Sequence, residues 1–272
     1  MALFCAATSA TLKADTFEVT YDAAGVEVAT AGTICGSASK CLLDEETFDS
    51  AWGGTIGNFN ATWTQMQATN VTGDSITGVY TGGTATTLYD QAAGQYGGGI
   101  SPGETTGGYY YYPEVTNGSY TLTLTPHGAG VGVNYFGLWV SALDADNTLK
   151  IYNNGGTLLY TLTAASLISV LGACPGGPYC GNPDGTYKGQ DANEQFVFLN
   201  FYDMSGGFSK VTFSEADASG FESDNQTVGF VSTIVPTGTE MYFMGPEPGS
   251  FALLSMGAAA LMALRRRRAR GR

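Results

Sequence analysis

Two short acidic segments contain the side chains best suited to chemistry in this sequence. SALDADNTL places Asp144 and Asp146 at a bend between apolar runs, and GFESDNQT places Glu222 and Asp224 just before another run. Ca²⁺ takes six to eight oxygen ligands, and two such loops could supply several of them. The sequence therefore predicts a weak Ca²⁺ site at Asp144, Asp146, Glu222 and Asp224, provided that the loops meet. The alternative is that both segments form Asx turns at strand ends.

Side chains for catalysis are scarce. His127 is the single histidine, in TPHGAG, and no arginine precedes residue 265. A Ser-His-Asp triad therefore has no signature here, and a turn histidine is more often structural. The chain has 24 carboxylates, but no spacing selects a pair for glycoside hydrolysis. We expect no enzymatic activity, and a secreted polysaccharide hydrolase ranks third among the functions considered.

Four cysteines form two local pairs. Cys35 and Cys41 bracket CGSASKC, and Cys174 and Cys180 bracket CPGGPYC. Each flexible loop is short enough for a local disulfide, which predicts the pairs Cys35–Cys41 and Cys174–Cys180 and an oxidising compartment. Sequence alone leaves three connectivities open. A zinc site of four thiolates is the alternative, although its cysteines are usually more closely spaced.

The body of the chain is strongly acidic. Before residue 265 it has five lysines against all 24 carboxylates, a formal net charge of −19. Such a surface repels phosphate backbones, so nucleic-acid binding is not expected. The segment GGYYYYPE adds four consecutive tyrosines at 109–112. Alternate tyrosines of a strand face outward, where they could stack on sugar rings or simply cover a sheet.

The alternation of apolar residues predicts an all-β fold, a β-sandwich of jelly-roll type, with about eight to twelve short strands. A first hairpin is expected over 17–28 and a clearer one over 149–162, because Asn153 to Gly156 accept positive φ cheaply. Further strands are expected at 120–124, 194–202, 208–215 and 226–235, with one short helix within 162–173. The stretch 78–108, rich in Gly and Thr, is expected to be a long loop or a disordered insertion.

The expected sandwich spans residues 15–235, between two segments of different character. Residues 1–14 resemble the second half of a secretory signal peptide without its basic start, with an ordinary first strand as the alternative. Residues 236–248 are expected to form a linker that contains Pro246, Glu247 and Pro248. Residues 249–272 are expected to form a hydrophobic helix and an arginine cluster.

The C-terminal segment combines features of a membrane anchor. Residues 250–264 contain no charge, and six of the last eight residues are arginines, including Arg265, Arg266, Arg267 and Arg268. As a helix, the apolar run would be about 22 Å long, somewhat short of a hydrocarbon core of about 30 Å. Snorkelling arginines reduce that difference. The arginines are expected to stop the segment in the membrane with the C-terminus in the cytoplasm and the acidic body outside.

The order of these parts resembles the PEP-CTERM sorting signal of bacterial surface proteins. The resemblance covers the 28 residues from Gly245 to Arg272. It implies that an exosortase-type enzyme recognises Pro246, Glu247 and Pro248 and removes the tail, with Ser250 to Leu264 as a transient anchor in the inner membrane. Gly245 stands where that family often has valine.

The body resembles, more loosely, a group of exosortase-dependent surface proteins with a sandwich domain. The matching residues are Tyr135, Phe136, Gly137, Leu138, Trp139, Ser141, Asp146 and Asn147, followed by Phe221, Glu222, Asp224 and Asn225. This resemblance implies a sandwich and no enzymatic activity, and it names no ligand. The expected function is an exported structural or adhesive protein of the cell surface, extracellular matrix or biofilm. The alternative is a permanently anchored carbohydrate-binding module whose partner is an extracellular polysaccharide.

Overall fold

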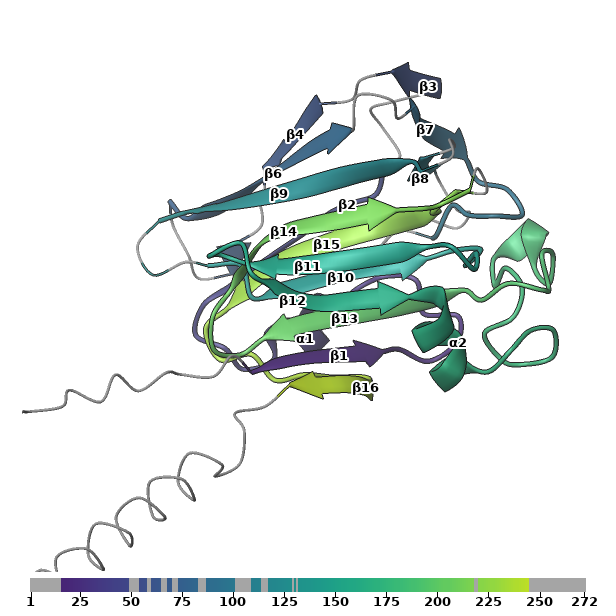
Figure 1. Cartoon of the computed structure of the whole chain (residues 1–272). Helices are drawn as coiled ribbons and strands as arrows, with labels where there is room; N and C mark the ends of the chain where they lie inside the picture. Colours follow the sequence, from purple (N-terminus) through teal and green to yellow (C-terminus); the bar gives the residue numbers. More distant parts are fainter. Residues whose placement is uncertain are drawn as a thin grey trace, which may run out of the picture.

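The computed structural model describes residues 16–48, 54–57, 60–64, 68–69, 73–82, 87–100, 109–113, 117–128, 130, 132–217 and 220–244. Within them the chain forms two antiparallel sheets, which confirms the all-β sandwich (Figure 1). The first sheet has ten strands: β1 (Phe17–Tyr21), β2 (Cys41–Glu46), β3 (Gly54–Gly57), β5 (Ala68–Thr69), β7 (Thr87–Ala92), β8 (Tyr109–Pro113), β10 (Tyr135–Val140), β13 (Val197–Asp203), β15 (Ser223–Val231) and β16 (Thr239–Met244).

The second sheet has six strands in the order β12-β11-β14-β9-β6-β4. They are β4 (Asn60–Thr64), β6 (Ser75–Gly82), β9 (Ser119–His127), β11 (Thr148–Asn153), β12 (Leu158–Thr163) and β14 (Phe208–Ser214). The helices are α1 (Ala31–Cys35), α2 (Ala164–Leu171) and the 3-10 turn η1 (Gly185–Tyr187). The predicted hairpin at 149–162 is therefore β11–β12. The predicted short helix is α2, which begins with a reciprocal capping box between Thr163 and Ser166.

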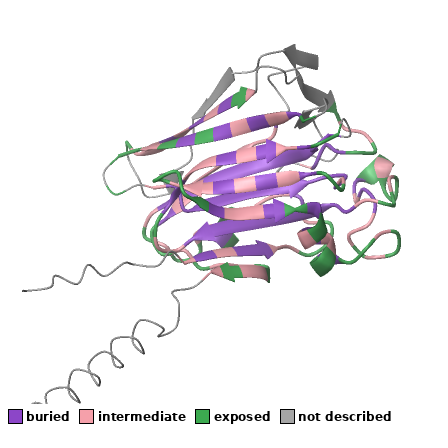
Figure 2. Cartoon of the chain, viewed as in Figure 1, coloured by how far each residue is buried: buried purple, intermediate pink, exposed green. Residues whose placement is uncertain are grey.

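The main core lies between the sheets. Strands β9, β11 and β14 alternate buried and less buried residues, as strands with one solvated face do. All six residues of β10 and all seven of β13 are buried, because these central strands are covered on both faces (Figure 2). The inner face of β10 contributes Phe136, Leu138 and Val140 to the core between the sheets.

The outer face of the ten-stranded sheet is covered by the segment that follows β1. Ile34 of α1 packs with Tyr135 and Tyr202, and Val26 and Ala29 pack against a second cluster around Trp139. This covering segment explains why β10 and β13 are buried along their whole length, a pattern more common in sheets with helices on both faces.

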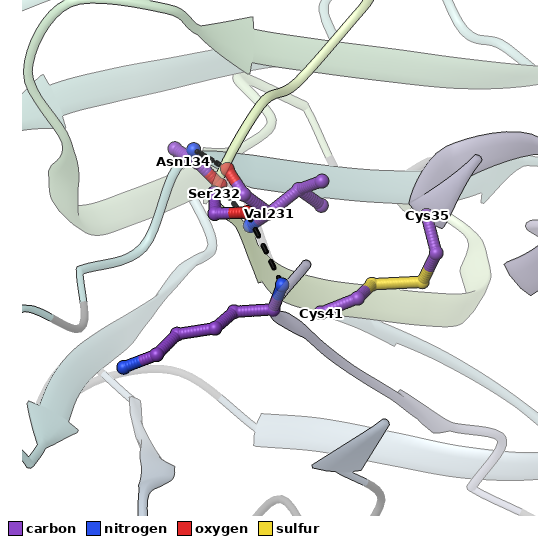
Figure 3. The surroundings of a disulfide bond; sticks show 6 residues. Cys35, Cys41, Asn134, Val231 and Ser232 are labelled. Atoms are coloured by element: carbon purple, nitrogen blue, oxygen red, sulfur yellow. Dashed lines mark hydrogen bonds between the residues drawn. A yellow bond between two sulfur atoms is a disulfide. The ribbon is translucent and has the colours of Figure 1, made fainter. Parts of the chain in front are cut away.

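Both predicted disulfides, Cys35–Cys41 and Cys174–Cys180, are present, each with Cα atoms 5.6 Å apart. The first joins α1 to the start of β2, beside the end of β15 (Figure 3). There, Asn134 donates from its amide nitrogen to the carbonyl of Val231 and accepts from the Val231 amide. The two bonds are those of a protein that folds in an oxidising environment.

We expect Cys35→Ser with Cys41→Ser to lower the free energy of unfolding by about 2–3 kcal/mol, through lost loop-closure entropy in the unfolded chain. Cys174→Ser with Cys180→Ser is the matched control, because its loop has the same length. The first pair should cost more, since buried Cys41 also holds α1 against the sheet. Urea denaturation of both variants measures this, and a larger loss from the second pair would contradict it.

Three expectations about the chain's organisation were wrong. Residues 26–28 are not a strand, because β1 pairs with β13 and β16 instead of folding back on the next segment. The expected loop at 78–108 contains the end of β6 and all of β7. The expected linker at 236–248 contains β16, which pairs with β1 at the edge of the sheet, so the sandwich extends to Met244. On the side of β1 that faces away from β13, the backbone N–H and C=O groups need partners, and β16, which is distant in sequence, provides them.

Candidate functional site

A cavity of about 510 Å³ lies among three loops. The loop after β1 contributes Glu27, and the loop after β7 contributes Ile100. The loop after α2 contributes residues 180–185, 188 and 189. The Cys174–Cys180 disulfide closes the start of the third loop, and Lys188 near its end also lines the cavity. The walls are thus built from turns, which a sheet can present at its end without interrupting its hydrogen bonds.

The start of β15 positions two of these loops. Asp224 is fully buried, and its Oδ2 accepts a hydrogen bond of 2.7 Å from the amide of Gly99. Asn225 donates from Nδ2 to the backbone carbonyl of Glu27 at 2.9 Å. The next residue after Gly99, Ile100, donates its amide to Oε2 of Glu27 at 2.7 Å. Asp224 and Asn225 therefore fix both the backbone and the carboxylate of Glu27.

Asn182 holds the third loop in the same way. Its Oδ1 accepts from the amide of Asp184 at 2.8 Å, an Asx turn, and its Nδ2 donates to the carbonyl of Gly94 at 3.0 Å. Its backbone amide donates to Gln190, and its carbonyl accepts from Gly189. The side chain of Asn182 thus links the loop after α2 to the loop after β7, and it places Asp184 in the wall of the cavity.

The cavity brings two carboxyl groups together. Burial raises the pKa of Glu27 to about 7; the Ile100 amide opposes this shift, and the nearby Asp184 contributes to it. Burial likewise raises the pKa of Asp184 to about 6. No ion pair joins Lys188 to either carboxylate among the described residues. Such a pair can share a proton, bind a cation, or accept hydrogen bonds from hydroxyl groups of a ligand.

The sequence did not indicate Glu27, Asn182 or Asp184. A signal was available in CGNPDG, where an Asn two residues before an Asp and a Gly directly after it form turns readily. The partner, Glu27, lies in a separate segment with no such feature. Because Glu27 and Asp184 are far apart in the sequence, no local pattern shows that their side chains meet in the folded protein.

The four residues predicted to bind Ca²⁺ do not assemble around one ion. Glu222 is close enough to Asp144 for the Asp144 carboxylate to raise its pKa, whereas Asp224 contacts the Gly99 loop and Asp146 is exposed on the turn before β11. In the described part of the chain, no group of three or more His, Cys, Asp or Glu residues is arranged to hold a metal ion. The expected site fails because Glu222 and Asp224 take part in different loop contacts.

The two segments that carry the looser resemblance lie side by side. Trp139 pairs with Asp224 across β10 and β15, and the amide of Ser141 donates to the carbonyl of Glu222. Asn147 donates from its side chain to the carbonyl of Gly220. Most of these polar residues are buried and bonded to backbone groups, so their primary role is to join the segments.

His127 ends β9, and its Nε2 lies 2.9 Å from the hydroxyl of Thr77 on β6 in an exposed position. This is a cross-strand contact, in keeping with a structural histidine. The four tyrosines form most of β8, but their side chains lie outside what the structure describes.

The remaining predicted site residues also lie outside the described residues. They are Pro246, Glu247, Pro248 and Arg265 to Arg268, together with the segments 1–14 and 249–272 and the expected C-terminal helix. Among the helices that are described, none has the length and apolar character needed to cross a membrane.

Comparisons with known proteins identify no family. No family model matches the chain, and no curated protein matches it. One solved structure, an exo-β-1,3-galactanase from Phanerochaete chrysosporium with β-1,3-galactotriose, is 15% identical with a TM-score of 0.24. The match covers 56% of this chain and 32% of the galactanase. At that level the likeness carries no argument about function.

Proposed function

We propose that this chain is an exported protein of the cell surface or extracellular matrix, released from a transient membrane anchor by an exosortase-type enzyme. The observation that carries the proposal is the order of three parts after the sandwich: Pro246-Glu247-Pro248, an uncharged apolar run, and the arginine cluster. Export agrees with the two disulfides, because such bonds persist in oxidising compartments.

The position of β16 supports removal of the tail. β16 ends at Met244, two residues before Pro246, and Met244 pairs with Phe17 at the start of β1. A cut within or after the Pro-Glu-Pro motif would therefore leave every described strand in place. The mature protein would keep its acidic sandwich and lose all six arginines.

The proposed role of the sandwich is structural or adhesive, and the chain is proposed to catalyse no reaction and to bind no nucleic acid. The jelly-roll type is part of the proposal. It is supported by the alternation of consecutive strands between sheets, since β9, β11, β12 and β14 lie in one sheet and β10, β13 and β15 in the other.

Intact-mass measurement in a host that has the processing enzyme tests the proposal. The wild-type mature protein should lack Arg272. Glu247→Ala should accumulate as an uncleaved membrane-bound precursor, because it removes the only charge of the motif and leaves the apolar run unchanged. A permanent anchor predicts instead that Glu247→Ala has no effect and that Arg272 remains.

Replacing Arg265 to Arg268 with serine tests separately whether the arginine cluster orients the membrane segment. We expect these chains to pass through the membrane unprocessed, because the stop and the orientation signal are lost. Fractionation should find them away from the membrane at full length. Normal processing of this variant would contradict the role assigned to the arginines.

A further inference from the structure

Asp184 is an unusual residue in the wall of the cavity. Its side chain is 3% exposed, and among the described residues neither Oδ1 nor Oδ2 accepts a hydrogen bond from an N–H or hydroxyl donor; its side-chain contact is with the carboxyl group of Glu27. A buried carboxylate without donors is costly, because it loses its hydration and receives nothing in exchange. Asp224, which contacts the Gly99 loop, is better satisfied, since it accepts from the amides of Gly99 and Asn225. Among the described residues, Asp184 therefore has the carboxyl group of Glu27 beside it but no N–H donor and no cation.

Glu27 faces the same cavity with a carboxylate that is only half satisfied. Oε2 accepts the amide of Ile100, and the carboxyl group also contacts that of Asp184, which supplies no N–H donor. Glu27 is 7% exposed, and the nearby Asp184 carboxylate helps to raise its pKa. Lys188 lines the cavity but makes no ion pair with either carboxylate in the part of the chain that is described. Two buried acidic groups thus meet in a polar cavity, and no cation of the described residues forms an ion pair with them.

We propose that this cavity binds one Ca²⁺ ion between the carboxylates of Glu27 and Asp184. Asp184 offers both oxygens and Glu27 offers Oε1, which are the hard oxygen ligands that Ca²⁺ prefers. Carbonyl oxygens of the third loop and water complete a shell of six to eight ligands. The sulfur of Cys180 is held in a disulfide, so this site offers no thiolate for zinc.

Two asparagines that contact the loops hold Asp184 and Glu27 in place. Asn182 fixes the turn that carries Asp184, and Asn225 fixes the backbone of Glu27. Because only two carboxylates contribute, the affinity should be in the range of extracellular calcium modules, about 10⁻⁴ to 10⁻³ M. This inference does not depend on the proposed processing of the tail.

The test measures the thermal stability of the full chain, purified in a non-ionic detergent with both disulfides formed. Addition of 10 mM CaCl₂ at neutral pH should raise the Tm of the wild type by about 3–10 °C, from the expected affinity and domain size. Calorimetric titration with CaCl₂ should give one site per chain.

Asp184→Asn and Glu27→Gln remove one ligand charge each and should lose the calcium response. Asp184→Asn should also raise the Tm without calcium, because it neutralises a buried unpaired group. Asp146→Asn is the matched control, since it removes one exposed carboxylate and should keep the wild-type response. Failure of calcium to stabilise the wild type overturns the proposal. So does an equal rise in Tm in the wild type and in both ligand variants.

Discussion

Replacing Trp139 with alanine is expected to lower the free energy of unfolding by about 3–5 kcal/mol. Trp139 is 1% exposed and packs with Phe196 and Phe198 on the outer face of β10 and β13. A Cβ atom added at Gly99 would lie 3.1 Å from its Cε3, so the Gly99 loop rests directly on the indole. Loss of the ring leaves a cavity beneath this loop, which also holds Glu27 through Ile100.

Chemical denaturation of Trp139→Ala and Trp139→Phe measures this effect. Phenylalanine keeps part of the buried ring and should cost clearly less than alanine. Val235→Ala, at a site where the side chain is 64% exposed, is a control that should change stability by less than about 0.5 kcal/mol. A loss below about 1 kcal/mol for Trp139→Ala would show that the outer cluster contributes little to folding.

The protein is expected to lose stability as the pH rises from about 5 to about 8. Burial raises the pKa of Glu222 well above its ordinary value, and Asp144, Glu194 and Asp191 raise it further. Burial and Asp191 raise the pKa of Glu194 to about 8. Because these carboxyl groups release their protons near pH 4.5 when unfolded, the folded state binds more protons above that value. Stability therefore falls with pH until the folded groups have also ionised.

Glu222→Gln isolates the contribution of that carboxyl group. Glu222 is 5% exposed, and its Oε2 has no hydrogen-bond partner among the described residues, so the neutral amide avoids the cost of a buried charge. We expect the variant to be more stable than the wild type at pH 8 by more than about 1.4 kcal/mol, the equivalent of one pKa unit. At pH 5 the two proteins should differ much less.

Urea denaturation at pH 5, 6, 7 and 8 tests this expectation. Asp146→Asn removes an exposed carboxylate on the turn that carries Asp144, and it should leave the slope of stability against pH in place. A wild-type stability that rises between pH 5 and pH 8, or a slope unchanged by Glu222→Gln, would contradict it.

The strands that could be predicted are those whose patterns are local. The β11–β12 hairpin follows from Asn153 to Gly156 between two apolar runs, and the short helix expected within 162–173 is α2. The β16 strand was missed because its partner is β1, more than 200 residues away in sequence. The same reason hides the candidate site, in which Glu27 and Asp184 are joined only by folding.

By itself, the sequence determined the all-β class, the two local disulfides and the acidic body, because strand alternation, loop length and charge are properties of short segments or of composition. Only the tertiary structure decided which acidic residues meet. Glu222 joins Asp144, Asp191 and Glu194, while Asp224, two residues away, turns to the Gly99 loop. The packing of loops against the sheet, rather than their spacing along the chain, sets which carboxylates become neighbours. For that reason the acidic pair of the cavity is Glu27 and Asp184, two residues that no local pattern connects.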